Sequence, residues 1–500
     1  MLKHAIGGAA ALLLATTAFA RAEVDAQTIW SDWQETYARF GGTLEADSED
    51  YTDGTLTLES VTVTSAAGDE TVETTIGTVT MVEKPDGTVR IELPAEFEMS
   101  ATTIEGDLEQ TQDMTVTQDG LDIVASETDG ERTYEVAARS INVEMTQQMA
   151  LPEGEEPDPD REMPPTDITF TLSDIASTYR SGVGGAEGAF EQDGTVASAQ
   201  VVVDVRSETD PLTATYVMDG LELDVTGAYG PAPTEPVRSL ADAGITYDGT
   251  LSHSGSALTA RGSGEDQTYG IDGSSASGEM VVGLDGDQLS YAVTSTSPEL
   301  TLESSSYPSA IALSMSEIAS TFALPVGGAG EEKPFSLSLA LRELVVDDAV
   351  WALFDPTGQL PRDPATFAVE LDGTAEMNVD MFGDPEALAA LEGPPGELKS
   401  LNLVELTLEA AGAALRGSGE LTFPEPTPVP QPVGTIELTL DGGFALMDKL
   451  VALGFLPAEQ VAFVKGMSGA VAETVGEDQL RSTIEFTEGG GITANGLPLR

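Results

Sequence analysis

Residues 56–63, LTLESVTV, decide the predicted fold, because apolar side chains there alternate with polar ones as in a half-buried β-strand. The apolar positions are Leu56, Leu58, Val61 and Val63. The alternation therefore slips by one residue at Glu59-Ser60. A slip of one residue normally moves side chains to the other face of a sheet, so a β-bulge at this point would keep all four on the core.

The same spacing returns twice further along the chain. It is found at Leu339, Leu341, Leu344 and Val346, and again at Leu401, Leu403, Leu406 and Leu408. Three bent strands with the same spacing of apolar residues indicate that one structural unit is repeated along the chain. Together with the abundance of Gly, Thr, Ser and Val, they predict a mainly β, elongated antiparallel protein whose twisted or bent sheets form an open barrel or a groove.

A second repeat predicts the domain organisation. Residues 316–329, SEIASTFALPVGGA, match residues 173–186, SDIASTYRSGVGGA, at nine of the fourteen positions, and residues 31–42, SDWQETYARFGG, form a fainter third copy. We predict about three related β modules, residues 21–165, 166–310 and 311–500, which follow a signal peptide at residues 1–20. Alternating apolar residues lead into the second and third copies, so each is expected to be a strand that runs into a helical turn and a Gly-Gly hinge.

The N-terminus is typical of an exported protein. Lys3 precedes an apolar run from Ala9 to Ala15, and small residues follow at Ala18 and Ala20. This order predicts a secretory signal peptide cleaved after residue 20 or 22, and the run is too short to span a bilayer. We therefore expect no stable transmembrane span after cleavage, and a periplasmic location ahead of secretion or outer-membrane association. The chain has no cysteine, so buried apolar surface must stabilise it.

Helices are predicted at both ends of the mature chain. Residues 26–40 place Ile29, Trp30, Trp33, Tyr37 and Phe40 on one helical face, with Asp25 as the N-cap. That face could dock on a membrane or partner, but packing on the adjacent sheet is the simpler interpretation. Short C-terminal helices are expected from Asp384 to about Glu392, from Phe444 to Leu453, and after Pro457.

Asp-Gly pairs recur along the chain and are typical of the type I′ turns that join antiparallel strands. They begin at Asp53, Asp86, Asp119, Asp129, Asp193, Asp219, Asp248, Asp272, Asp285, Asp372 and Asp441. The spacing of a calcium-binding loop is missing around them, so turns are the favoured interpretation. Two proline-rich stretches, residues 151–166 and 424–432, predict an exposed joint and an extended spacer.

The charge excludes several classes of partner. The chain carries 86 acidic and 21 basic residues, a net charge of −65. Nucleic acids and anionic membrane surfaces attract clustered Lys and Arg, and no such cluster is present. No cofactor is expected beyond weak association of Ca²⁺.

Residues for the common catalytic chemistries are missing from the sequence. There are no cysteines and two histidines, of which only His253 would remain after cleavage. The usual zinc, copper, iron–sulfur and haem ligand sets are therefore absent, as are a G-x-S-x-G elbow and a phosphate-binding G-x-x-x-x-G-K-[ST] loop. We predict no catalytic, cofactor-binding or metal-binding residue. A pair of carboxylates for glycoside hydrolysis is the remaining catalytic alternative.

Several phrases carry a family resemblance. They are WALFDPTGQLPRDPATFAVELDG at residues 351–373, DGGFALMDKLVALGFL at residues 441–456, and GGGITANGLPL at residues 489–499. With the bent strands and the leader, they resemble an alphaproteobacterial exported or envelope family, the domain of unknown function twenty-one twenty-five, over most of the mature chain. The family implies no activity, cofactor or catalytic residue. The architecture is also distantly similar to envelope proteins that handle lipids in long β-sheet grooves.

Three functional hypotheses follow. The first is a noncatalytic envelope protein whose apolar face or groove binds a lipidic or other hydrophobic ligand, or which assists envelope maintenance. The second is a structural or interaction module that binds protein or glycan partners in the envelope. The third is a hydrolase that uses an acid pair.

Overall fold

The computed structural model describes residues 24–39, 42–67, 70–105, 108–150, 164–185, 188–207, 209–230, 244–264, 267–286, 288–327, 330–379, 381, 391, 393–424 and 431–499. Most of these residues form antiparallel β-strands, and the few helices include one near the N-terminus and two near the C-terminus, as predicted. The chain divides into two compact units, residues 1–268 and 269–500, called unit 1 and unit 2 below. The boundaries of the three predicted modules stay a prediction.

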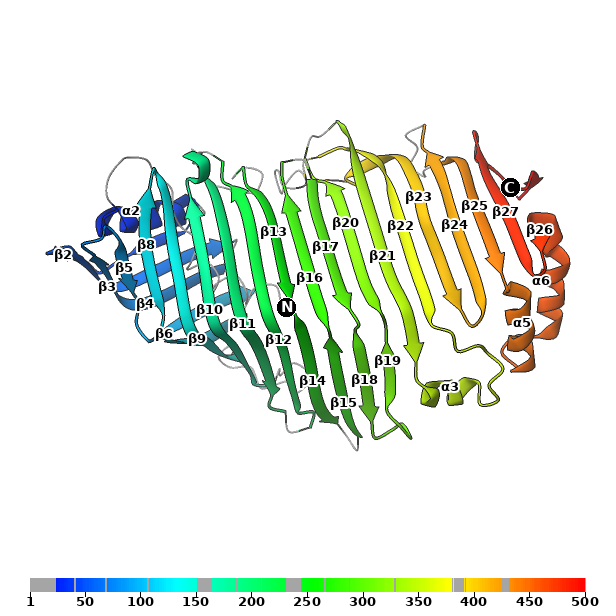
Figure 1. Cartoon of the computed structure of the whole chain (residues 1–500), viewed down its shortest axis with the longest axis horizontal. Coiled ribbons are helices and arrows are strands. Elements are labelled where there is room, and N and C mark those ends of the chain that lie inside the picture. The colour runs from blue at the N-terminus through cyan, green and yellow to red at the C-terminus, as the bar shows by residue number, and fades with distance from the viewer. Residues whose placement is uncertain are drawn as a thin grey trace. The chain divides into compact units, whose positions relative to one another are not determined.

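Unit 1 consists of one α-helix and a long series of strands (Figure 1). The elements are α2 (Ala26–Arg39), β1 (Thr43–Glu45), β2 (Ser48–Thr52), β3 (Thr55–Ala67), β4 (Glu70–Glu83), β5 (Val89–Glu92), β6 (Glu96–Glu105), β7 (Leu108–Asp119), β8 (Asp122–Thr128), β9 (Glu131–Ala150), β10 (Thr166–Ser181), β11 (Ala189–Val205), β12 (Leu212–Ala228), β13 (Thr246–His253) and β14 (Gly255–Gly264).

The strands of unit 1 pair in a nearly sequential order. Both β1 and β2 pair with β3, which pairs with β4. Strand β4 is then connected to β9 by two routes. One runs from β4 through β5 and β8 to β9, and the other from β4 through β6 and β7 to β9. These pairings close a ring through β4, β5, β8, β9, β7 and β6. From β9 the order continues through β10, β11 and β12 to β13 and β14.

Helix α2 covers the apolar face of this sheet. Asp25 caps it, with its carboxylate accepting from the backbone N–H of Thr28 at 2.8 Å. Ile29 and Trp30 are buried, and Trp33 and Tyr37 pack against the same core. This core extends along the sheet from β3 to β12, so the predicted amphipathic helix is confirmed and its apolar face packs on the sheet.

A buried ion cluster and a run of aromatic rings lie within or beside the core of unit 1. The guanidinium of Arg132 on β9 pairs with the Asp32 carboxylate on α2, and its Nη2 lies 2.8 Å from Oε2 of Glu127 on β8. On three neighbouring strands, the ring centroids of Tyr134 and Tyr179 are 6.4 Å apart, and those of Tyr179 and Phe190 are 6.1 Å apart. The ion cluster ties α2 to strands far from it in sequence.

Unit 2 continues with strands and three described helices. The elements are β15 (Gln267–Ser275), which begins two residues before the boundary, β16 (Ser277–Leu284), β17 (Gln288–Thr296), β18 (Glu299–Ser304), β19 (Ile311–Ser314), β20 (Glu317–Pro325), β21 (Glu332–Val346), α3 (Asp348–Phe354), β22 (Ala365–Met377), β23 (Gly396–Ala410), β24 (Ala413–Thr422), β25 (Val433–Asp441), α5 (Gly443–Ala452), α6 (Ala458–Val471), β26 (Glu473–Gly476), β27 (Gln479–Thr487), β28 (Gly491–Ala494) and β29 (Leu497–Pro498).

The main ladder of unit 2 runs through β16, β17, β20, β21, β22, β23, β24, β25 and β27, with every pair antiparallel. Figure 1 shows these long strands side by side, with α5 and α6 beyond β25. The two predicted C-terminal helices, from Phe444 and after Pro457, are thereby confirmed.

All three predicted slips in the strand alternation are register shifts. Ser60 has a φ of 51°, and the β3–β4 register shifts between Leu58 and Val61. The β21–β22 register shifts between Leu341 and Leu344, and the β23–β24 register between Leu403 and Leu406. In β3 the shift keeps Leu56, Leu58 and Val61 buried, which is the outcome expected of a bulge.

The helical turn predicted for the SDIAST and SEIAST repeats is wrong. Residues 173–181 continue β10 as a strand that pairs with β9 and β11, and residues 317–325 form β20. Ser, Thr and Ile favour strands over helices, and pairing on both edges adds to that preference. Gly184 and Gly185 do form a turn with positive φ, while the faint copy at residues 31–42 begins within α2. The three copies therefore do not share one structure.

Only some Asp-Gly pairs form turns. Asp53-Gly54 and Asp129-Gly130 have positive φ at both residues, as a type I′ turn requires. The pairs that begin at Asp193, Asp248, Asp272 and Asp372 instead lie inside strands. At Gly373 a Cβ would lie 2.2 Å from the Ser400 carbonyl oxygen and 2.9 Å from the Phe335 ring, so glycine there permits close packing across strands.

Asp355 organises the turn that follows α3. Its Oδ1 accepts from the backbone N–H of Gln359 at 2.9 Å, and its Oδ2 accepts from that of Leu360 at 2.7 Å. Burial by itself would raise the pKa of Asp355, but these two hydrogen bonds and one from Thr357 outweigh it and lower that pKa. The ionised carboxylate is therefore the form that holds the turn.

Replacing Asp355 by asparagine is expected to lower stability at pH 7 and to have less effect in acid. A carboxyl group whose pKa is lower in the folded state stabilises the fold above its unfolded pKa of about 3.9, and this contribution is lost as the pH falls through the folded pKa. Urea unfolding at pH 7 and pH 3 measures the difference between wild type and Asp355→Asn. Asp363→Asn, an exposed change in the same segment, is the control. An equal difference at both pH values would contradict this prediction.

Several predictions fall outside the described residues. They are the signal peptide, the joint at residues 151–163, most of the helix from Asp384 to Glu392, and most of the spacer at residues 425–430. Within the part of the chain that the structure describes, no helix combines the length and apolar character needed to cross a membrane.

Candidate functional site

The main candidate site is one face of the sheet in unit 2. Residues that are directly paired across an antiparallel ladder project to the same face, so the register assigns each side chain. Three rows of mainly apolar side chains cross β17, β20, β21, β22, β23, β24, β25 and β27, and they define what we call the apolar face. Ser or Gly interrupts the rows at Ser295, Ser320, Gly417, Gly419 and Ser482. Row one is Ile318, Leu341, Phe367, Leu408, Leu415, Leu440 and Leu480; row two is Val293, Leu339, Val369, Leu406 and Leu438; row three is Tyr291, Phe322, Leu337, Leu371, Leu403, Ile436 and Ile484.

The bulge at Leu403–Leu406 preserves this face. Between these residues β23 carries two residues, Val404 and Glu405, and only Glu405 has a partner on β22. Leu403 and Leu406 consequently pair with Leu371 and Val369, which are both on the apolar face. Without the bulge, one half of β23 would turn its leucines to the opposite face.

The opposite face of the same strands is polar. Its rows pair Ser338 with Glu370 and Glu370 with Glu405, and further rows contain Asp372 and Glu437. The sheet of unit 2 therefore has one polar face and one apolar face, and the alternation along each strand produces both.

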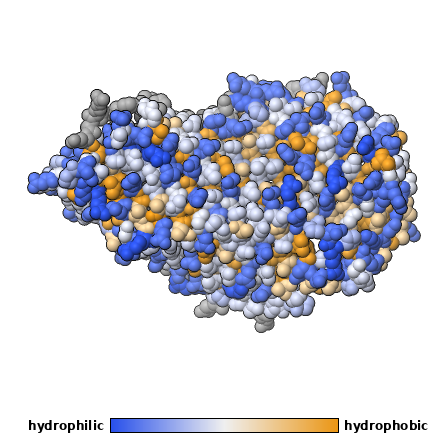
Figure 2. Space-filling model, viewed as in Figure 1, coloured by the Kyte–Doolittle hydropathy of each residue, from blue (hydrophilic) through white to orange (hydrophobic). Residues whose placement is uncertain are grey.

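The apolar face has no covering layer in the described structure. Leu337, Leu339 and Leu408 are 44%, 38% and 47% exposed. Both clusters of buried side chains among the described residues lie in unit 1, where α2 covers the sheet. Figure 2 shows one surface of the molecule, on which hydrophobic side chains emerge in patches between hydrophilic ones. Contiguous exposed apolar surface is uncommon on proteins, so this face is the main candidate for an interaction site.

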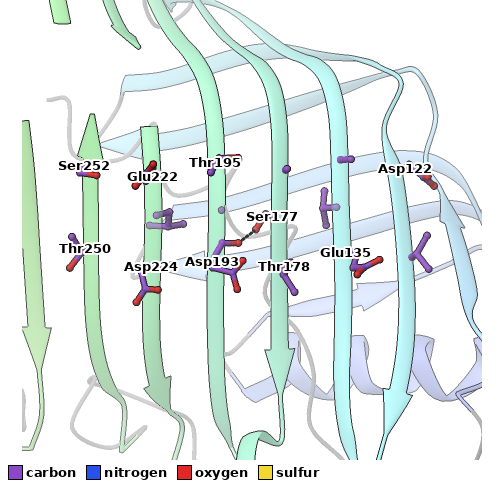
Figure 3. Close-up of a pocket in the computed structure, with 16 residues that line it drawn as sticks. Asp122, Glu135, Ser177, Thr178, Asp193, Thr195, Glu222, Asp224, Thr250 and Ser252 are labelled. Carbon is purple, nitrogen blue, oxygen red and sulfur yellow. Dashed lines mark hydrogen bonds between the residues drawn. The ribbon is translucent and has the colours of Figure 1, made fainter. Parts of the chain in front are cut away.

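A second candidate is a hollow of about 620 Å³ on unit 1, shown in Figure 3. Two cross-strand rows on β8 to β13 form its floor. Small side chains in these rows leave the space open. Hydroxyl and acidic side chains line it, and the acidic ones are Asp122, Glu135, Asp193, Glu222 and Asp224.

The chemistry of this hollow is limited. Two of its carboxylates are neutralised, because Asp122 lies 2.7 Å from Arg90 and Asp193 lies 2.9 Å from Arg180. The Ser177 hydroxyl donates to the backbone carbonyl of Asp193 at 3.0 Å, so this contact does not activate it as a nucleophile. Within the described ranges, no group of three or more His, Cys, Asp or Glu residues is placed to hold a metal ion. Weak Ca²⁺ association stays a prediction.

The structure places His253 at the end of β13, outside the lining of the hollow. Sequence reasoning named no site residues, yet the alternating leucines in two of the bent strands, β21 and β23, are now part of the apolar face. The other strands of this face were not predicted individually, although some carry the same alternation in shorter runs, as β25 does at residues 435–441.

The fold and this face define a mainly antiparallel β protein with an exposed apolar sheet surface. Residues 253–499 match the model of a family described as an uncharacterized protein conserved in bacteria (DUF2125). The predicted family resemblance is thus confirmed for the second half of the chain, whereas the sequence phrases had indicated a resemblance over most of the mature chain. No curated protein and no solved structure matches the chain.

Proposed function

We propose that the protein is a noncatalytic component of the bacterial cell envelope, exported to the periplasm, and that the apolar face of unit 2 binds the acyl chains of lipids. The observation that carries the proposal is the set of leucines exposed in the middle of a paired sheet, among them Leu337 and Leu339 on β21. Leaving such side chains in water is costly, at about 25 cal/mol for each Å² of apolar surface, so a ligand that covers them gains binding free energy.

The dimensions of the face fit an acyl chain. From β20 to β27 the main ladder contains seven strands at about 4.8 Å spacing, so the face is about 29 Å wide. The hydrocarbon core of a bilayer is about 30 Å thick and contains two acyl chains end to end, so one chain can lie across the strands.

The chemistry of the face also supports lipid over a folded protein partner. The rows consist mainly of Leu, Val, Ile and Phe, with small residues and one tyrosine between them, and they lack the Arg and Trp anchors that protein interfaces usually contain. The proposed location in the envelope rests on the predicted signal peptide, and lipids are abundant there.

The first test is native mass spectrometry of the protein isolated from a bacterial periplasm. We expect masses that correspond to bound lipid, which organic extraction should release and identify. A clean apoprotein mass, under conditions that preserve a known lipid complex, would be evidence against the proposal.

The second test uses a matched pair of variants on β21. Leu337→Gln/Leu339→Gln changes the apolar face, and Ser336→Gln/Ser338→Gln changes the opposite face of the same strand without altering the charge. The two half-exposed leucines would each contribute about 1 kcal/mol on covering, so we expect roughly 30-fold weaker binding for the first variant only. Titration calorimetry with a monoacyl phosphatidylcholine below its micelle concentration measures this. Equal affinity in both variants would show that the lipid binds elsewhere.

A further inference from the structure

The C-terminal helices carry an apolar patch that faces away from the sheet. Phe455, Phe463, Val464 and Met467 are 54%, 68%, 44% and 49% exposed, and we call them the helix patch. Phe463 and Met467 are one helical turn apart on α6, and Phe455 lies in the connection between α5 and α6.

The opposite side of α6 is the one that packs. Val461 is buried, and Lys465 donates to Asp448 of α5 at 2.6 Å. The Lys465 ammonium also lies 5.4 Å from the ring centroid of Phe444. These contacts fix α6 against α5 and leave its apolar side outward, which is the reverse of an ordinary surface helix.

The helix patch stands in a neutral part of a very acidic chain. The segment 443–472 contains two acids, Asp448 and Glu459, and two bases, Lys449 and Lys465, whereas the whole chain has a net charge of −65. Electrostatic repulsion from lipid headgroups is therefore weakest where the exposed phenylalanines are. Exposed Phe and Met side chains on a helical segment of zero net charge are suited to insertion at a membrane interface.

The first residue of α5, the helix on which α6 packs, adjoins the apolar face. At Gly443, the first residue of α5, a Cβ would lie 2.5 Å from Cδ2 of Leu440, which belongs to row one. The helices thus begin in direct contact with the surface proposed to bind acyl chains.

We propose that the helix patch docks on the surface of a lipid bilayer, with Phe463 and Met467 inserted among the acyl chains. A bilayer fits better than a second copy of this chain, because a second copy would bring its own large negative charge. The contact is hydrophobic, so docking should occur on zwitterionic vesicles and persist in salt. If docking serves to deliver lipid, that role rests on the proposed function. Docking of the helix patch on a bilayer does not depend on it.

The test uses the full chain and vesicles of phosphatidylcholine brominated on the acyl chains, which quench nearby tryptophan. Phe463→Trp preserves an aromatic ring in the helix patch, and Tyr307→Trp places one at a turn between β18 and β19, where Tyr307 is 57% exposed. After subtraction of the signal from the native tryptophans, we expect quenching at position 463 and none at position 307. Equal quenching at both positions, or none at either, would overturn the proposal.

A charge-introducing variant gives the second measurement. Phe463→Asp/Met467→Asp alters exposed side chains, so it should fold, and we expect at least a tenfold loss of vesicle co-flotation. Unchanged co-flotation would overturn the proposal, as would light scattering that shows a wild-type dimer and a monomeric variant, because the patch would then pair with a second copy. Binding of the monoacyl lipid by the same variant should be unaffected, which separates failure of docking from failure of the proposed function.

Discussion

Replacement of Arg132 by alanine is expected to destabilise unit 1 by about 3 to 5 kcal/mol, because it leaves buried carboxylates without their partner. The side chains of Arg132, Asp32 and Glu127 are only 7%, 5% and 9% exposed. Burying a charge is tolerable only when it is paired and hydrogen-bonded, and Arg132 supplies the pairing for both acids. The loss should appear as a lower midpoint for the unfolding of unit 1.

The effect should depend on pH. Burial already raises the pKa of Asp32, and Arg132 opposes that rise. Without Arg132 the pKa of Asp32 should rise further, so the folded state would favour the protonated acid. A raised carboxyl pKa destabilises the fold above the unfolded pKa of about 3.9 and does so less as the acid protonates. The deficit of Arg132→Ala should therefore be larger at pH 7 than at pH 4.5.

Arg90→Ala is the matched control. Arg90 pairs with Asp122 at 2.7 Å in the same unit, but the two side chains are 44% and 43% exposed. Exposed pairs contribute about 0 to 1 kcal/mol, so this variant should be close to wild type. If both variants lost the same stability, the buried cluster would not be the feature that holds α2 to the sheet.

This cluster could not be predicted from the sequence. Asp32 and Arg132 are 100 positions apart, and nothing in the local pattern relates them. The bulges in β3, β21 and β23 could be predicted, because a slip in alternation is local and a sheet has only two faces for a side chain to occupy.

For the repeat at residues 173–186, by contrast, the local sequence pattern led to a partly wrong prediction. Its Gly-Gly turn was predicted correctly, but the preceding residues were assigned a helical turn, whereas Ile175 and Tyr179 are paired on both sides in β10. Asp372-Gly373 was misassigned for a similar reason, since Gly373 makes room for Phe335 on the next strand. Contacts between neighbouring strands decided both cases, and one strand's sequence does not contain them.

The candidate site was predictable only in part. Alternation predicts that each strand has an apolar side, and it does so equally for Leu56 in unit 1 and Leu339 in unit 2. Leu56 is buried and Leu339 is 38% exposed, because α2 covers the first and nothing in the described structure covers the second. A covered and an uncovered face have the same pattern within the strand, so only the fold separates them.

The same contrast predicts two separate unfolding transitions. Unit 1 has the buried core and should unfold at the higher temperature, while unit 2 has an uncovered face and should unfold first in the absence of lipid. Calorimetry of wild type and Arg132→Ala would assign the transitions, because the substitution should move only that of unit 1. A single transition that moves as a whole would contradict this assignment.

Ligand should stabilise unit 2 alone. A ligand that binds only the folded state at 100 times its dissociation constant adds about 2.7 kcal/mol to the free energy of unfolding. For a unit of this size, residues 269–500, that corresponds to a rise of roughly 5 to 10 °C in the midpoint. The monoacyl phosphatidylcholine should therefore move the first transition toward the second, and Leu337→Gln/Leu339→Gln should abolish most of the shift. A rise confined to the transition of unit 1 would instead locate the lipid at the core beneath α2, and the apolar face would lose its proposed role.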